Sequence, residues 1–218
     1  MKNDQHNLIT LNTVFVVALI ISNVIVAKVV VTGITFFGVP LTFSGATVTY
    51  AITYLCTDII SEIWGKKEAQ DAVKRGFICQ LIVLGVIVLV QWLPSTDAET
   101  QQAYVKILGQ MPVFVIGSLM AFACSQTWDI WMFHKIRDKF NANPTMRWAW
   151  NNGSTMTSQL IDEVIWCLVC YGIGLGYLWT PEGRIMLVGL TIGDYLFKFC
   201  LALLDTPFFY LFTNKKAR

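Results

Sequence analysis

The hydrophobic positions of this chain fall into six long runs that are separated by short polar stretches. The runs are Leu8–Val31, Gly45–Gly65, Gly76–Leu93, Tyr104–Phe133, Ser154–Trp179 and Ile185–Phe212. A helix needs about 20 predominantly apolar residues to cross a bilayer, and each run is that long or nearly so. The pattern predicts an all-α integral membrane protein, with six transmembrane helices in a single domain over residues 1–218. The first run is too long for a cleavable signal peptide, and five more follow it.

The stretch between the first two runs, Thr32–Ser44, mixes glycine and proline with aromatic residues. This composition predicts a β-like or re-entrant loop on the outer side of the membrane. Pro112 and Pro207 fall inside predicted spans, where each removes a helix hydrogen bond and is expected to kink its helix. No internal repeat is visible, and an inverted-repeat transporter architecture therefore gains no support.

The composition also favours a membrane protein, because only 14% of the residues are charged and 55% are hydrophobic. Soluble domains carry about 25% charged residues. The net charge of +2 does not indicate nucleic-acid binding. All six cysteines lie in apolar runs, so no disulfide framework is expected. Cys167 and Cys170 have a C-x-x-C spacing on a predicted helix, where buried apolar thiols are favoured over a zinc site. We therefore expect no metal and no cofactor.

The basic residues gather on one side of the predicted spans. If the N-terminus is cytoplasmic, twelve of the 16 Lys and Arg residues lie inside. These twelve are Lys2, Lys66, Lys67, Lys74, Arg75, Lys135, Arg137, Lys139, Arg147, Lys215, Lys216 and Arg218. Lys106 and Arg184 lie outside, and Lys28 and Lys198 fall within spans. Because cytoplasmic loops carry an excess of Lys and Arg, the distribution predicts that both termini are cytoplasmic.

Ionisable side chains lie within or at the edge of the apolar runs. They are Lys28, Asp58, Glu62, Asp129, Asp162, Glu163, Asp194, Lys198 and Asp205. A charged side chain at the bilayer centre costs at least ~2.5–3.5 kcal/mol on insertion scales, so such residues are rare and usually functional. Their number indicates a polar pathway through the membrane rather than a passive anchor.

Helical spacing groups these side chains, because residues three or four apart share a helix face. The groups are Asp58 with Glu62, Gln126 with Asp129, Gln159 with Asp162 and Glu163, and Asp194 with Lys198. Asp194 and Lys198 can form an internal ion pair, and Asp205 lies three turns further on the same side of the helix. Glu163 is adjacent to Asp162 and must point elsewhere, toward a partner helix or a basic residue such as Arg147.

Some of these residues also have a purely structural interpretation. Glu62 can reach cytoplasmic water, and Asp129 can pair with Lys135 or Arg137 near the surface. Asp194 and Lys198 can simply neutralise each other. Asp58, Gln159 and Asp162 are hardest to explain in this way, because they lie roughly 8–12 Å from the cytoplasmic helix ends. They also have no obvious local cation.

Carboxylates and amides in one pocket offer both acceptors and donors of hydrogen bonds. Beside aromatic side chains, which make up 13% of the chain, they suit a flat heterocycle with amino and lactam groups. Stacking on an aromatic ring contributes ~1–3 kcal/mol per base, and the polar groups fix the identity of the ligand. This chemistry alone fits many substrates.

Five sequence blocks, in order, carry a resemblance to a known family. They are S-N-V-I-V-A-K (Ser22–Lys28), T-D-I-I-S-E-I-W-G (Thr57–Gly65), S-Q-T-W-D (Ser125–Asp129), W-N-N-G-S-T-M-T-S-Q-L-I-D (Trp150–Asp162) and G-D-Y-L-F-K (Gly193–Lys198). Together they resemble the queuosine precursor transporters, YhhQ-like vitamin uptake transporters. Each block is short, but their order and spacing over almost the whole chain make the set specific.

The resemblance implies a six-helix importer in the bacterial inner (plasma) membrane that serves salvage for tRNA modification. Its substrates would be 7-deazaguanines, namely the cyano or aminomethyl precursor or the base queuine. The resemblance also implies kinship with the substrate-binding subunits of energy-coupling-factor transporters, although an energy-coupling module is not required. The implied site residues are Asn23, Asp58, Gln126, Asp129, Asn152, Gln159, Asp162, Asp194 and Lys198. Variation is expected at Glu62 and Glu163.

Two other functions compete with this interpretation. One is a substrate-binding subunit for another vitamin or nucleobase, which would need an ATPase partner. The other is an intramembrane enzyme, but the G-x-G-D motif of membrane aspartyl proteases has Thr191 in place of its first glycine, and no histidine lies deep enough for Ser-His chemistry. We therefore expect no enzyme. The expected partners are a deazapurine and membrane lipid, with a homodimer compatible with the sequence.

The predicted topology can be tested with a cysteine that is added after Arg218. Because both termini are expected in the cytoplasm, this cysteine should be protected from an impermeant thiol reagent in intact cells and should react after the cells are opened. Reaction in intact cells would overturn the topology.

Overall fold

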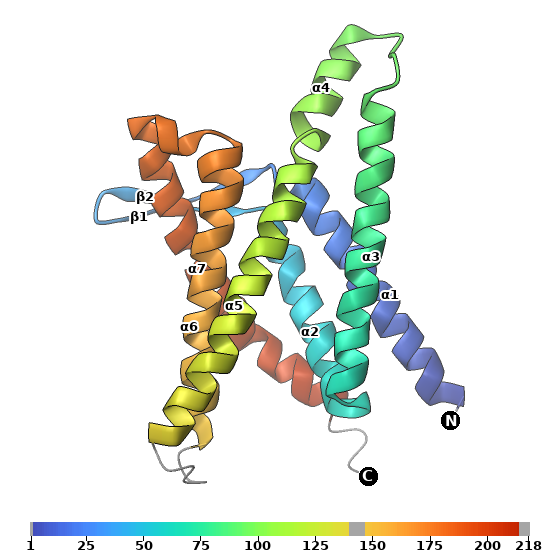
Figure 1. Cartoon of the computed structure of the whole chain (residues 1–218), viewed down its shortest axis with the longest axis vertical. Helices are drawn as coiled ribbons and strands as arrows, with labels where there is room; N and C mark the ends of the chain where they lie inside the picture. Colours follow the sequence, from blue (N-terminus) through green and yellow to red (C-terminus); the bar gives the residue numbers. More distant parts are fainter. Residues whose placement is uncertain (1, 140–146, 214–218) are drawn as a thin grey trace. The chain divides into compact units, whose positions relative to one another are not determined.

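The computed structural model describes residues 2–139 and 147–213 and is mostly helical (Figure 1). Its elements are α1 (Lys2–Ile25), β1 (Val29–Phe36), β2 (Val39–Ser44), α2 (Ala46–Trp64), α3 (Lys66–Gln91), α4 (Ala98–Leu108), α5 (Met111–Lys139), α6 (Arg147–Cys167), the π-helical segment η2 (Leu168–Gly174), the 3₁₀ turn η3 (Tyr177–Trp179) and α7 (Pro181–Thr213). Each of the six predicted runs is largely helical, although the first run extends into β1 and the fifth continues from α6 through η2 and η3. The predicted helical fold is therefore confirmed, with a two-stranded hairpin added to it.

Within the described residues, four helical stretches are long and apolar enough to cross a membrane. They are Gln5–Ile25, Lys67–Gln91, Ala98–Ser125 and Met156–Gly174. The other two predicted spans coincide with α2 and α7, which carry several of the ionisable groups. A multi-pass membrane protein is confirmed in this way, and the number of six spans stays a prediction.

The fourth predicted span is divided where the sequence suggested a kink. Helix α4 ends at Leu108 and α5 begins at Met111. Pro112 therefore lies in the first turn of α5, where its missing N–H is not needed by the helix. The proline disrupts the run as expected, but the disruption is a break between two helices.

Asp97 caps the N-terminus of α4, directly before the stretch that is apolar enough to cross the membrane. The Asp97 carboxylate accepts hydrogen bonds from the backbone N–H groups of Glu99 and Thr100, at 3.3 and 2.8 Å. The Thr100 hydroxyl and these N–H groups hold the pKa of Asp97 below its usual value. The cap therefore stays ionised at neutral pH and is lost only in acid, as the pH falls through the lowered pKa.

The stretch that was predicted as a β-like or re-entrant loop forms a β-hairpin. Phe37 and Gly38 connect the strands with φ angles of 49° and 80°. Two successive positive φ values are typical of the tight turns that match the twist of a hairpin. The Thr32 hydroxyl donates a hydrogen bond to the Leu41 carbonyl across the strands, at 2.7 Å. The β-like alternative is therefore the one that the structure shows.

The chain divides into two compact units, which are described separately. The first unit contains Met1–Val31, Phe43–Pro112 and Leu196–Arg218, and the second contains Thr32–Thr42 and Val113–Tyr195. In the first unit α1, α2 and α3 pack on one another. Phe15 and Leu19 of α1 form an apolar cluster with Cys56 of α2.

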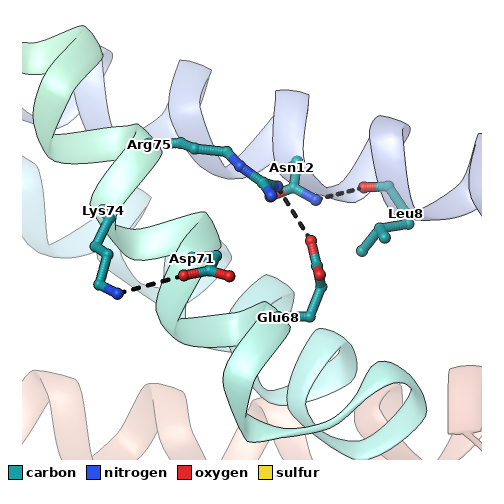
Figure 2. Close-up of polar contacts among 6 residues, drawn as sticks. All are labelled: Leu8, Asn12, Glu68, Asp71, Lys74 and Arg75. Carbon is teal, nitrogen blue, oxygen red and sulfur yellow. Dashed lines mark hydrogen bonds and ion pairs between the residues drawn. The ribbon is translucent and has the colours of Figure 1, made fainter.

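Charged residues cover the start of α3 in the first unit (Figure 2). Arg75 forms an ion pair with Glu68 at 3.1 Å, and Lys74 forms one with Asp71 at 3.3 Å. Exposed pairs of this kind contribute little to stability. Their position fits the assignment of this helix end to the aqueous side of the membrane.

In the second unit, glycines on α5, η2 and α7 allow close approach of neighbouring segments. A Cβ at Gly117 would overlap Cys170 Sγ, and one at Gly174 would overlap the Val113 side chain. On α7, Cβ atoms at Gly189 and Gly193 would overlap the carbonyl oxygens of Pro40 and Thr42 in β2. Small residues at helix contacts are typical of membrane proteins. Here they seat the hairpin directly against α7.

Replacement of Gly193 should therefore loosen the packing of the hairpin on α7. We expect Gly193→Ala to destabilise the protein by about 1–3 kcal/mol, because the added methyl overlaps a backbone carbonyl that cannot rotate away. The matched control is Gly85→Ala on α3, where no heavy atom lies within 4 Å of the new Cβ. Thermal unfolding of both variants in detergent tests this. Equal melting temperatures would contradict the packing described here.

Candidate substrate-binding site

The nine site residues that the resemblance implies are divided between the two units. Asn23, Asp58 and Lys198 belong to the first unit, and the other six belong to the second. The side chains of Gln126, Asp129 and Asn152, and that of Asp205, lie outside the described part of the structure. The remaining six can be placed by their contacts and burial.

Asp162 on α6 is half-buried and faces α5. The Ser125 hydroxyl, which is itself buried, lies 3.1 Å from Asp162 Oδ1 and donates to it. The same hydroxyl lies 3.2 Å from the carbonyl oxygen of Phe122. This bond occupies one of the roughly four lone-pair sites that the two oxygens of a carboxylate offer. Ser125 thus orients Asp162 at the seam between α5 and α6.

Aromatic side chains lie along the same face of α5, one turn beyond Ser125. Trp128 donates from Nε1 to the Thr157 hydroxyl of α6 at 3.1 Å, and this hydroxyl donates to the Gly153 carbonyl at 2.8 Å. The Trp128 ring packs on Trp131, with centroids 5.0 Å apart. The hydrogen bonds hold the indole against α6, one turn along α5 from Ser125, the partner of Asp162. This places an aromatic ring and a hydrogen-bond acceptor on one helix seam.

A second polar cluster lies between α6 and α7, and sequence reasoning missed it. Glu163 and Asp194 are completely buried, as is Cys167. Their ligand atoms lie within 4.8 Å of one another. The Cys167 thiol donates to Glu163 Oε1 at 3.3 Å. Glu163 therefore points away from Asp162 toward the neighbouring helix, which was one of the two directions expected for it.

Two carboxylates this close in a buried site repel each other when both are ionised. Two carboxylates and one thiol are also within the ligand repertoire of zinc. The Cys170 thiol does not join them, because it lies against the carbonyl oxygens of Val113 and Phe114 on α5, at 3.8 and 4.0 Å. Cys167 and Cys170 thus face different neighbours despite their C-x-x-C spacing. The π-helical segment η2 begins at Leu168, directly after Cys167, and includes Cys170.

In the first unit, Asn23 is buried and its amide donates to the Leu19 carbonyl of its own helix at 3.0 Å. The Lys198 ammonium lies over the ring of Tyr50, 5.3 Å from its centroid. Beside it, the rings of Phe43 and Phe197 stack at 4.2 Å. A cation held over an aromatic ring is stabilised by ~0.5–2 kcal/mol, and more strongly when water is excluded.

Three charged or polar candidates lie on the outside of the chain. Asp58 and Gln159 are exposed, although they were expected in a deep inner tier. Glu62 is exposed as well, which agrees with its structural interpretation. Among the predicted site residues that the structure describes, Asn23 and Asp194 are therefore buried, and Asp162 and Lys198 are half-buried.

Comparisons with known proteins bear on what these residues do. Residues 44–212 match the family described as "Putative vitamin uptake transporter". The "Probable queuosine precursor transporter" of Bacillus subtilis (strain 168) is 32% identical over 186 residues, which cover 83% of this chain and 75% of the relative. The chain belongs to this vitamin uptake transporter family. No solved structure matches the chain.

Membership confirms the family that the five sequence blocks indicated. It also confirms that the protein is a transporter and not an enzyme.

The predicted ion pair between Asp194 and Lys198 can be tested by single and double substitutions. If the pair neutralises charge, Asp194→Asn or Lys198→Met alone should destabilise the transporter by roughly 3–5 kcal/mol, because a buried charge loses its partner. The double variant should then regain thermal stability without regaining uptake, since Lys198 is expected to donate to the substrate. Glu182→Gln is the control, because it removes an exposed carboxylate from the first turn of the same helix and should change neither stability nor uptake. Full recovery of uptake in the double variant would rule out the substrate role of Lys198.

Proposed function

We propose that this transporter imports queuosine precursors, 7-deazaguanine bases such as the cyano or aminomethyl base, or queuine. The observation that supports this most directly is that α5 and α6 are joined by a hydrogen bond from Ser125 to the half-buried Asp162 carboxylate and, one turn along α5, by a hydrogen bond from Trp128 to Thr157. The substrate named for the Bacillus subtilis relative agrees with it. A planar base with a polar edge matches an aromatic ring beside an oriented acceptor.

The chemistry at Asp162 follows from the hydrogen-bonding edge of a guanine-like ring. Such a ring presents a lactam N–H and an exocyclic amine side by side, and an ionised carboxylate can accept from both. The bond from Ser125 occupies one acceptor site of Asp162. Gln159 is one turn away on α6 and would contact the same edge. Gln126, Asp129 and Asn152 are proposed as further contacts from the same sequence blocks.

The proposed setting is the bacterial inner membrane, crossed six times, with α2 and α7 as the two spans beyond the four most apolar stretches. Both termini would be cytoplasmic, as the basic residues indicate. The proposed site at which a proton or cation couples to transport is the buried pair of Glu163 and Asp194. We also propose that the protein is related to the substrate-binding subunits of energy-coupling-factor transporters. A homodimer is part of the same proposal.

A second candidate is a substrate-binding subunit for another vitamin or nucleobase that needs an ATPase partner. The general description of the family as vitamin uptake transporters favours it. Uptake of labelled 7-deazaguanine into vesicles that contain only this chain would separate the two functions. Binding without uptake would favour the subunit.

The role of Asp162 can be tested by Asp162→Asn in purified protein. Loss of an acceptor for a buried polar partner costs ~1–3 kcal/mol, and more when a charge is involved, so the affinity for 7-deazaguanine should fall about tenfold or more. The control is Asp71→Asn, which removes a carboxylate from an exposed ion pair with Lys74 and should leave the affinity unchanged. Unchanged affinity in a folded Asp162→Asn protein would remove Asp162 from the site.

A further inference from the structure

The tip and the first strand of the β-hairpin expose large apolar side chains. Phe37 is 91% exposed, Val31 71%, Ile34 62% and Phe36 47%. The rings of Phe36 and Phe37 meet edge to face, with centroids 4.7 Å apart, and form a two-ring tip. Residues 29–57 include no charged side chain. Contiguous apolar surface of this kind marks a place where a protein contacts another apolar surface.

The two strands of the hairpin differ in how the protein covers them. In β2, Leu41 and Thr42 are buried, and the carbonyl oxygens of Pro40 and Thr42 lie against the glycines of α7. In β1, every residue from Val31 to the end of the strand is exposed. The hairpin is therefore held through β2, and it presents β1 and the tip to its surroundings.

The backbone at the tip is strained by the presence of an aromatic residue. Phe37 has a φ angle of 49°, which bulky side chains rarely adopt. Glycine and asparagine adopt this conformation at lower cost. Strain of this kind, where it persists, points to a function. Because the Phe37 ring is almost fully exposed, a contact outside the chain would offset this cost.

The two ends of the hairpin are fixed at the end of α1. The Lys28 N–H donates to the Ile25 carbonyl at 3.1 Å, and the Gly45 N–H donates to the Lys28 carbonyl at 2.8 Å. The Ser44 hydroxyl lies 3.4 Å from the Val26 carbonyl oxygen and donates to it. The stretch of α1 that is long and apolar enough to cross a membrane ends at Ile25. The hairpin therefore begins and ends at a membrane surface.

The apolar surface of the hairpin follows directly on an apolar face of α1. Val14, Val17 and Ile21 are exposed and are spaced three and four residues apart, so they share one face of the helix. Lipid covers such a face in a helix that spans a membrane. The eight residues of β1 extend at most about 26 Å, at roughly 3.3 Å per residue. The tip can thus lie along the bilayer surface at which α1 ends.

The outer edge of β1 is poorly suited to pair with a strand of a second copy. Gly33 has a φ angle of 76°, and the Ile34 N–H donates to the Thr32 hydroxyl at 3.1 Å. A left-handed residue inside a strand interrupts the regular row of N–H and C=O groups that a further strand needs. The side chains, rather than the strand edge, therefore make the contact, and lipid is the partner that suits them.

We propose that the β-hairpin is a lipid anchor, in which the rings of Phe36 and Phe37 insert at the acyl boundary of the leaflet where α1 ends. Val31 and Ile34 contact the same boundary. Hydrocarbon excludes unpaired backbone groups, so the strands themselves stay among the headgroups and only side chains reach the acyl chains. This anchor is independent of the substrate that the transporter carries. It restrains β2, which packs on α7.

The depth of the tip can be measured in the full-length protein in phosphatidylcholine vesicles. Phe37 is replaced by para-trifluoromethylphenylalanine, and fluorine relaxation is measured with oxygen, which concentrates in the bilayer, and with a nickel chelate, which stays in water. The same label at Val17 reports lipid, and at Gln70, exposed in the charged start of α3, it reports water. The label at Phe37 should follow Val17, with strong relaxation by oxygen and loss of relaxation by nickel.

Each other result at the tip would overturn the proposal. Relaxation by nickel as strong at Phe37 as at Gln70 would place the tip in water. Protection from both reagents would show that protein covers the tip, as a second copy of the chain would. The same label at Phe36 repeats the measurement if position 37 does not accept it.

A double variant tests whether the two rings hold the hairpin at the bilayer. Phe36→Ser with Phe37→Asn removes both rings and keeps the turn, because asparagine tolerates a positive φ. With the fluorine label at Ile34, relaxation by nickel should rise and relaxation by oxygen should fall relative to the unaltered tip. Thr35→Asn is the matched control, since it exchanges one exposed polar side chain for another and should change neither. Unchanged relaxation in the double variant would contradict an anchor made by the rings.

Discussion

Hydrocarbon offers no hydrogen-bond partners, so every polar group within a membrane-spanning helix must be satisfied by the protein or by what the protein binds. Several hydroxyl groups in the described helices donate to a carbonyl three or four residues earlier, as Thr191 does to Leu187 at 2.8 Å. The carboxylates cannot be satisfied in this way because they only accept. Asp162 therefore depends on Ser125 of another helix, and Glu163 depends on the Cys167 thiol. The polar groups thus fix which helix faces meet.

Close packing between these faces depends on residues without bulky side chains. Gly76 allows α3 to approach Phe15 of α1, and Gly193 allows α7 to approach the carbonyl of Thr42 in the hairpin. Without a hydrophobic driving force between helices in lipid, such contacts and buried hydrogen bonds hold the bundle together. Asp194 directly follows Gly193. The glycine that seats the hairpin therefore also sets the position of a buried carboxylate.

The positions of the helices could be predicted from the sequence because a bilayer imposes a minimum length on apolar runs. The break before Pro112 was less predictable, since a proline can either kink a helix or start one. The hairpin was expected only as one of two alternatives. Its choice depends on Phe37 adopting a positive φ beside Gly38, which residue type alone does not indicate.

The candidate site was predictable only in part. Asp162 and Asp194 stood out as charges in apolar runs, but the proximity of Glu163, Cys167 and Asp194 arises from the packing of α6 on α7, which periodicity cannot give.

The central claim is that polar groups buried in this membrane protein recognise a 7-deazaguanine. Equilibrium binding of a radiolabelled 7-deazaguanine to the purified protein, with unlabelled guanine as competitor, tests it most directly. We expect saturable binding that unlabelled 7-deazaguanine displaces at lower concentration than guanine does, with the ligand recovered unchanged. Absence of saturable binding, or displacement by guanine at the same concentration, would contradict the account.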